Sequence, residues 1–205
     1  MGYFPFFVDL EGQPGLIVGG GTVALRKADK LLPYGPRLTV VSPHILPELE
    51  RIPGLTLSRR EFSPADLDGM LFAIAATDDR GLNRRIAELC RERHIPVNAV
   101  DDREACSFLF PALVKRGDLS VGISTGGASP TAAIWLKEQV SGLLPNRFDE
   151  ILTWLEEQRP RLKAALPQES QRSRLFARLF TACLDRGRPL TQAEIQGILQ
   201  EEGLE

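Results

Sequence analysis

A short apolar run that ends in three glycines constrains the fold of this chain more than any other feature. Residues 15–18 predict a strand, the glycines a tight turn, and the residues from Thr22 a helix. The spacing Gly19-x-Gly21-x-x-Ala24 is typical of a dinucleotide-binding turn. Gly19 allows the sharp bend, Gly21 lets a pyrophosphate approach the backbone, and Ala24 lets the helix pack closely on the strand. A strand-to-helix turn without a ligand is the alternative interpretation.

The second predicted strand, residues 37–41, lacks one part of this fingerprint. It ends without the acidic residue that usually binds the ribose hydroxyls, and no arginine stands there to accept a 2′-phosphate. Backbone groups around Ser42, Pro43 and His44 would therefore have to hold the ribose.

Apolar runs alternate with helix-period segments up to about Ala133. The predicted strands are residues 15–18, 37–41, 55–58, 71–75, 96–100 and 119–123, and the predicted helices are 22–33, 79–93 and 130–142. This alternation indicates an α/β fold, a Rossmann-type doubly wound parallel sheet with helices on both faces.

After Pro145 the pattern changes to an all-helical C-terminal tail. Helices are predicted at 147–166, 170–186 and 192–202, and Thr191 and Glu194 form a capping box before the last one. We expect a nucleotide-binding domain over 1–113, a separate segment over 114–145, and a helical domain over 146–205.

The composition excludes several classes of protein. No apolar run approaches the roughly 20 residues that span a bilayer, and a net charge of −2 gives no support to nucleic-acid binding. The start of the chain lacks the basic residues of a secretory signal, so we expect a cytoplasmic protein. Three scattered cysteines and two histidines make no metal or disulfide pattern.

Two further loops follow predicted strands and would meet the glycine turn at the carboxyl edge of the sheet. Thr77 and Asp78 could contact a nucleotide, or Asp78 or Asp79 could cap the next helix. Asp101 ends an apolar strand, where partial burial would suit its carboxylate to proton transfer. The alternative for Asp101 is a turn aspartate, which is our interpretation of Asp102.

A second glycine-rich loop covers residues 122–130. Ser129 is a good N-cap and Pro130 suits a first helical turn. The loop could bind an anion, or it could be a plain strand-to-helix turn.

Together these segments resemble the N-terminal module of siroheme synthases, the precorrin-2 dehydrogenase and sirohydrochlorin ferrochelatase family. The resemblance covers roughly residues 3–145 and is carried by five motifs in family order: Phe4-Pro5-Phe6-Phe7, residues 18–27, Ala75-Ala76-Thr77-Asp78-Asp79, Asn98-Ala99-Val100-Asp101 with Ser107-Phe108, and residues 124–130.

The resemblance implies NAD⁺-dependent oxidation of precorrin-2 to sirohydrochlorin by an intertwined homodimer. In such a dimer residues 114–145 would be the dimerisation and substrate-cleft segment, which supplies the dimer contact and part of the cleft. It places the nucleotide contacts on the glycine turn and the loops that follow the second and fourth strands, and it makes Asp101 the catalytic aspartate. The cofactor residues it implies, with Gly19 from the turn, are Gly19, Gly21, Thr22, Val23, Pro43, His44, Thr77 and Asp78.

The implied substrate carries many carboxylates, so the cleft is expected to be locally basic. Arg103 and Lys115 are candidates to bind it, together with Ser124 and Ser129 of the second glycine-rich loop. If Fe²⁺ is a second substrate, Asp101 could accept pyrrole protons without a resident metal site. A chain of 205 residues leaves no room for a uroporphyrinogen methyltransferase domain, so we expect another protein to methylate.

Two other function classes fit the sequence less well. A short-chain dehydrogenase needs a Tyr-x-x-x-Lys pair, but Phe7 and Leu38 stand four residues after the two tyrosines. A non-catalytic nucleotide-sensing module also begins with a Rossmann unit. It usually keeps the acidic residue after the second strand, and it does not predict Asp101.

Overall fold

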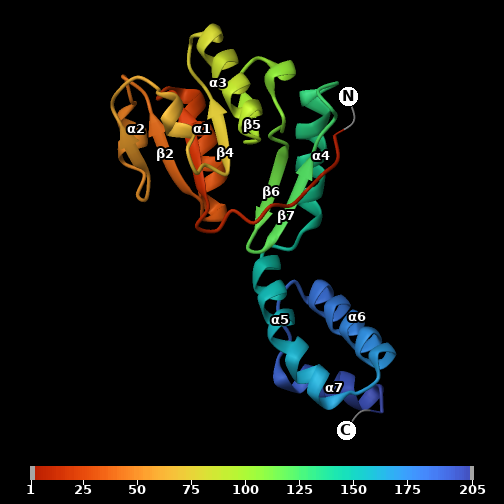
Figure 1. Cartoon of the computed structure of the whole chain (residues 1–205). Helices are drawn as coiled ribbons and strands as arrows, with labels where there is room; N and C mark the ends of the chain where they lie inside the picture. Colours follow the sequence, from red (N-terminus) through yellow and green to blue (C-terminus); the bar gives the residue numbers. More distant parts are fainter. Residues whose placement is uncertain (1–2, 204–205) are drawn as a thin grey trace. The chain divides into compact units, whose positions relative to one another are not determined.

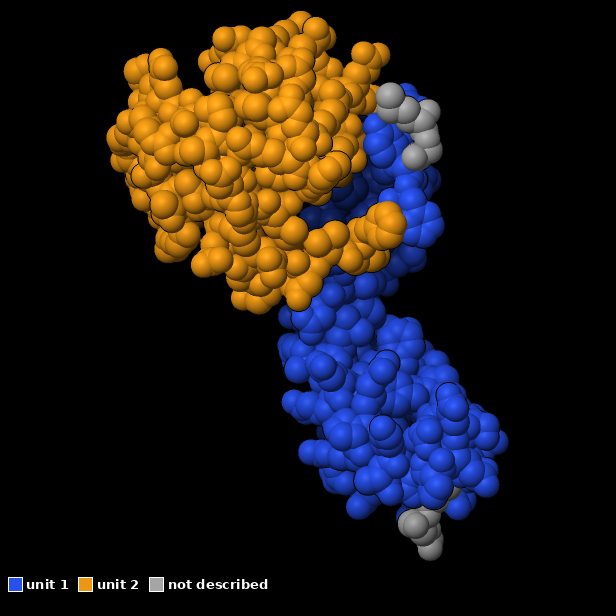
Figure 2. Space-filling model, viewed as in Figure 1, with its two compact units in different colours: residues 1–5, 111–205 blue, residues 6–110 orange. Residues whose placement is uncertain are grey.

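The computed structural model describes residues 3–203, so the outermost residues of the predicted domains at 1–113 and 146–205 lie outside it. The chain divides into two compact units, which Figure 2 shows in different colours. One unit is Phe6–Phe110. The other is Pro111–Glu205 together with Met1–Pro5.

The Phe6–Phe110 unit is built on a five-stranded parallel sheet in the order β3-β2-β1-β4-β5 (Figure 1). Its strands are β1 (Pro14–Val18), β2 (Arg37–Val41), β3 (Thr56–Ser58), β4 (Phe72–Ala75) and β5 (Val97–Ala99). In register, Val18 lies opposite Val41 on one side and Ala75 on the other. All strands therefore end at one edge of the sheet, where a ligand site is expected.

Helices cover both faces of this sheet because alternate strand residues point to opposite sides. Ile17 and Ile74 belong to one core, with Ala24 and Ala28 of α1 (Thr22–Leu31). The neighbours of these residues along β1 and β4 point to the other face of the sheet. They are Leu16, Val18, Ala73 and Ala75, and they belong to a second core with α3 (Arg80–Glu92). The predicted α/β fold is confirmed, and Ala24 is fully buried, as close helix-to-strand packing requires.

Short elements complete this unit. They are α2 (Pro47–Glu50) and three 3₁₀ helices, η1 (Leu32–Tyr34), η2 (Pro64–Leu67) and η3 (Arg103–Ala105).

The unit of Pro111–Glu205 contains an antiparallel hairpin, β6 (Ala112–Arg116) and β7 (Leu119–Ile123), and the helix α4 (Pro130–Leu143) that contacts both strands. The predicted strand at 119–123 is present as β7, within the 114–145 segment and outside the parallel sheet, whereas β6 was not predicted. The two-residue turn Gly117-Asp118, in which Gly117 has a φ of +51°, folds β7 back on β6.

Three helices make the C-terminal tail: α5 (Phe148–Ala165), α6 (Glu169–Arg186) and α7 (Gln192–Glu201). Their core contains Ile151, Leu175, Leu179 and Cys183. The predicted capping box of α7 is present. None of the helices in the described part of the chain is both long enough and apolar enough to cross a membrane.

Candidate nucleotide and catalytic site

The three glycines after β1 have different structural roles. Gly19 has a φ of +120°, and a Cβ there would lie 2.2 Å from the carbonyl oxygen of Ala76. A Cβ on Gly20 would lie 2.1 Å from the carbonyl oxygen of His44. A Cβ on Gly21 would meet nothing within 4 Å. The first two glycines therefore pack backbone against backbone, whereas Gly21 faces open space where a ligand can approach.

The start of α1 offers hydrogen-bond donors to that space. Gly21 is the N-cap and supplies no side-chain cap, so the first backbone N–H groups of the helix have no partner of that kind. Thr22 is exposed and Val23 half-buried. These N–H groups and the positive end of the helix dipole are suited to an anionic phosphate group.

The loop after β2 is docked on the glycine turn. The amide of Leu46 donates to the carbonyl of Gly20 at 2.9 Å, and the hydroxyl of Ser42 donates to the carbonyl of His44 at 2.7 Å. Pro43 and His44 are exposed beside this contact. The loop is thus fixed at the same sheet edge as Gly21.

The loop after β4 is held by a buried amide that the sequence analysis missed. Asn83 is 3% exposed, and its Oδ1 accepts from the amide and the hydroxyl of Thr77, while its Nδ2 donates to the Thr77 carbonyl. Asp79 caps α3, because its carboxylate accepts from the amides of Gly81 and Leu82. The cap is therefore Asp79, and Asp78 is left exposed at the site.

Asp101 and Asp102 follow β5 but differ in surroundings. Asp102 accepts from the amide of Ala105 and from Nε of Arg84 at 2.6 Å, and the hydrogen bond from Arg84 lowers the pKa of Asp102. It is the turn aspartate that was predicted. Asp101 is exposed, with a φ of +58°. The partial burial expected for Asp101 is therefore wrong for this chain by itself.

A polar contact joins α1 to β5 beneath this edge, and the sequence analysis did not find it. Nζ of Lys27 donates to Oδ1 of Asn98 at 3.0 Å and lies 3.7 Å from the ring centroid of Phe110. Burial lowers the pKa of Lys27 to about 8. A polar residue at the middle of an apolar strand was the signal that could have pointed to Asn98.

The four predicted substrate residues are divided between the units. Arg103 is exposed in the Phe6–Phe110 unit, at the start of η3. In the Pro111–Glu205 unit, Lys115 donates to the carbonyl of Gly117, and Ser124 accepts from the amide of Gly126. Ser129 caps α4 by accepting from the amide of Ala132 at 3.1 Å. The predicted N-cap is confirmed, and the substrate roles stay predictions.

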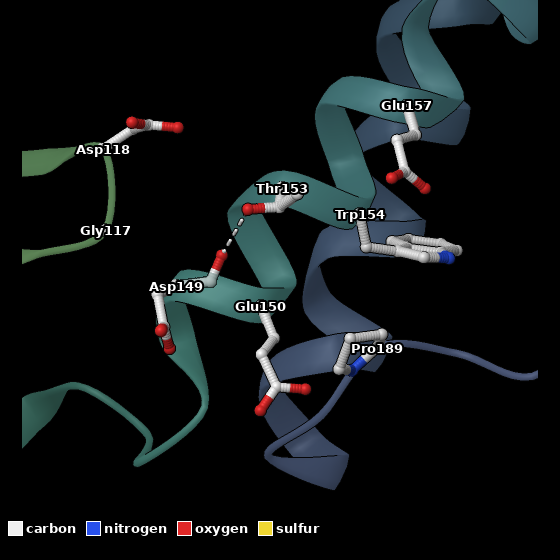
Figure 3. A pocket seen from close by; sticks show the side chains of 8 residues that line it. All are labelled: Gly117, Asp118, Asp149, Glu150, Thr153, Trp154, Glu157 and Pro189. Atoms are coloured by element: carbon white, nitrogen blue, oxygen red, sulfur yellow. Dashed lines mark hydrogen bonds between the residues drawn. The ribbon is translucent and has the colours of Figure 1, made fainter.

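A pocket in the Pro111–Glu205 unit contains none of the predicted site residues (Figure 3). It is lined by Gly117, Asp118, Asp149, Glu150, Thr153, Trp154, Glu157 and Pro189. Four of these side chains are carboxylates, which would repel a ligand that is itself rich in carboxylates.

Comparison with known proteins agrees with this geometry. Residues 6–112 match the model of a family of NAD(P)-binding domains. The chain belongs to this NAD(P)-binding family. Residues 116–142 match the central part of sirohaem biosynthesis proteins. The predicted nucleotide cofactor and the resemblance to siroheme synthases are both confirmed.

Curated relatives of this family member are siroheme synthases. The enzyme of Thioalkalivibrio sulfidiphilus is 41% identical over 183 residues, which are 88% of this chain and 37% of that protein. Siroheme synthase 2 of Aeromonas salmonicida is 40% identical over 89% of this chain and 38% of its own length. The chain thus spans less than half of these relatives.

A solved structure is similar over nearly the whole chain. It is SirC, a precorrin-2 dehydrogenase, with a TM-score of 0.72 and 27% sequence identity. The match covers 97% of this chain and 98% of SirC. The similarity to this dehydrogenase thus extends over both units, including the helical tail.

Proposed function

We propose that this chain is an NAD-dependent dehydrogenase that oxidises precorrin-2 to sirohydrochlorin. The observation that carries the proposal is the placement of an open glycine turn and Asp101 at the same edge of one parallel sheet. The glycine turn supplies a phosphate site at Gly21, and the end of β5 supplies an exposed carboxylate. The similarity to SirC along the whole chain supports the choice of substrate.

The residues around the glycine turn would hold the nucleotide. The N–H groups of Thr22 and Val23 would bind the pyrophosphate, and the backbone at Pro43 and His44 would meet the ribose. Thr77 and Asp78 border the same edge, and Gly19 keeps the turn closed against Ala76. NAD⁺, when bound, accepts the hydride that precorrin-2 loses.

The oxidation also releases a proton, and in this proposal Asp101 accepts it. The described residues 3–203 give its carboxylate no hydrogen bond or ion pair, whereas Asp102 is engaged by Arg84 and by the amide of Ala105. Both oxygens of Asp102 already accept a protein hydrogen bond, whereas both oxygens of Asp101 are open to the substrate. Arg103, Lys115, Ser124 and Ser129 would bind the substrate carboxylates.

The same site would support iron insertion into sirohydrochlorin as a second reaction. As Fe²⁺ enters the ring, two pyrrole protons must leave, and Asp101 could accept them in turn. Fe²⁺ would be a substrate in this reaction.

We also propose that the chain works as a homodimer through residues 114–145. Helix α4 exposes large apolar side chains, with Ile134 53%, Trp135 56% and Leu143 82% exposed. Apolar side chains of this size gathered on one exposed helix are typical of an interface between subunits.

The test is an anaerobic assay of the purified chain with precorrin-2 and NAD⁺. We expect the sirohydrochlorin spectrum and NADH to rise together in the wild type. Loss of the general base should lower kcat by about 10²–10⁴-fold in Asp101→Ala. The matched control is Asp185→Ala, which replaces an exposed aspartate on α6 and should have the kcat of the wild type. Addition of Fe²⁺ to the product then tests the second reaction.

NAD⁺ binding without turnover of precorrin-2 would instead support the alternative, a nucleotide-sensing module, and would overturn the enzyme assignment. Turnover that is unchanged in Asp101→Ala would keep the enzyme and remove Asp101 from its mechanism.

A further inference from the structure

The loop that carries Asp101 is closed at its base by the thiol of Cys106. Sγ of Cys106 lies 3.2 Å from the amide nitrogen of Ala99, 3.1 Å from the Ala99 carbonyl oxygen and 3.2 Å from the Asp102 carbonyl oxygen. The sulfur accepts from the amide, and its single proton can go to one of the two carbonyls. One side chain thus joins the end of β5 to the return of the chain.

Asn98 holds this thiol from the other side. The amide is 6% exposed, and its Nδ2 donates to the carbonyl of Phe108 at 3.0 Å and faces Sγ of Cys106 at 3.5 Å. Its Oδ1 accepts from Lys27 of α1. The base of the loop is therefore connected to the helix whose first turn faces the phosphate site. Burial raises the pKa of Cys106, so the thiol keeps its proton and can donate.

Asp101 depends on this closure for its conformation. Its φ of +58° is uncommon for a residue with a side chain, and such a backbone persists only where the surroundings fix it. No hydrogen bond or ion pair to the carboxylate itself is found within residues 3–203, so the backbone sets the direction of the Cα–Cβ bond from which the carboxylate extends. Asp102 fixes one side of the loop through its cap to Ala105, and Cys106 fixes the other.

We propose that Cys106 is a positioning residue for Asp101, whose thiol closes the Ala99–Cys106 loop and so fixes the direction of the catalytic carboxylate. The inference rests on the proposed function, because it takes Asp101 as the proton acceptor. It assigns no chemistry to the sulfur, which touches only protein groups.

The experiment is a double-mutant cycle of Cys106→Ala with Asp101→Ala in the full chain, assayed with precorrin-2 and NAD⁺. A carboxylate displaced by a fraction of an ångström to an ångström should lower kcat by about 10- to 10²-fold in Cys106→Ala, with the Kd for NAD⁺ within about twofold of the wild type. In the Asp101→Ala background the same change should have no further effect on kcat, because there is no carboxylate left to position.

Two further variants separate positioning from folding. Cys106→Ser keeps a donor and an acceptor and should recover most of kcat. Cys90→Ala removes a fully buried thiol of α3, so it should lower the melting temperature but leave kcat unchanged. Amide exchange gives a readout without turnover, since the Ala99 N–H should exchange faster in Cys106→Ala than in Cys90→Ala.

An equal loss of kcat in the wild-type and Asp101→Ala backgrounds would overturn the positioning role, as would unchanged kcat in Cys106→Ala. Failure of the proposed function looks different, because wild type and Asp185→Ala would then both lack turnover. In that case unchanged exchange of the Ala99 amide in Cys106→Ala would still overturn the loop closure by itself.

Discussion

Replacing Gly21 by alanine should separate nucleotide binding from folding. The backbone there has a φ of −90° and a ψ of −170°, which any residue adopts, and a Cβ would meet no protein atom within 4 Å. The new methyl group would instead stand in the space in front of the first N–H groups of α1. We therefore expect Gly21→Ala to fold normally and to bind NAD⁺ poorly.

The magnitudes follow from the local structure. A hydrogen bond to a charged group contributes about 1.5–3 kcal/mol, so displacement of the pyrophosphate from one N–H should raise the Kd by about 10- to 150-fold. The stability should change by less than about 1 kcal/mol, because alanine is a poorer N-cap than glycine but also lowers the entropy of the unfolded chain.

Gly19→Ala is the matched comparison from the same turn. Gly19 has a positive φ, and a Cβ there would lie 2.2 Å from the carbonyl oxygen of Ala76. The free energy of unfolding should therefore fall by about 3 kcal/mol or more. Isothermal titration with NAD⁺ and thermal unfolding, run on both variants, measure the two effects. Wild-type NAD⁺ affinity in Gly21→Ala would refute the assignment of this turn to the pyrophosphate.

Three further predictions test other parts of the chain. Asn83→Ala should lower the free energy of unfolding by about 2–4 kcal/mol and weaken NAD⁺ binding, because the backbone groups of Thr77 lose their partner. Denaturant unfolding and titration with NAD⁺ would measure the two effects, and an unchanged affinity would refute the link to the site. The hydrogen bond from Arg188, followed by that from the Thr191 amide, lowers the pKa of Glu194 below its ordinary 4.5. The stabilisation of the tail by these contacts is therefore present above pH 4.5 and is lost as the pH falls further. The melting temperature should depend less on acidic pH in Glu194→Gln than in the wild type, and an unaltered pH profile would contradict this. Trp135→Glu should give a monomer in analytical ultracentrifugation if α4 is the subunit interface, with the exposed tail position Glu156→Gln as the control; a dimer of unchanged stability would exclude α4.

The parallel sheet could be predicted because each strand is a short apolar run bounded by turn residues. Strand β2 and helix α4 begin where the sequence places them. The hairpin could not be found in the same way, because the run Ala112–Arg116 is only partly apolar and ends in two cations. The signal was the Gly117-Asp118 dipeptide between two strand-length segments, which favours a hairpin over a crossover.

The conformation of the glycine turn could be predicted for a similar reason. Glycines between a strand and a helix indicate a tight turn, and the structure separates the two glycines that pack against backbone from Gly21, which faces open space. The buried amides Asn83 and Asn98 could not be assigned partners, because Thr77 and Lys27 meet them only through tertiary contacts. Sequence spacing fixes local conformation, whereas these contacts depend on how α1 and α3 pack on the sheet.

The pair Asp101 and Asp102 shows how far position alone can distinguish neighbouring carboxylates. Both follow the same strand, and Asp101 has a left-handed backbone conformation. The carboxylate of Asp102 accepts hydrogen bonds from the amide of Ala105 and from Arg84. The side-chain hydrogen bonds that close this loop come from Asp102 and Cys106. Within residues 3–203 the Asp101 carboxylate has no hydrogen bond or ion pair, so the proposed general base could take up a substrate proton without first breaking an ion pair.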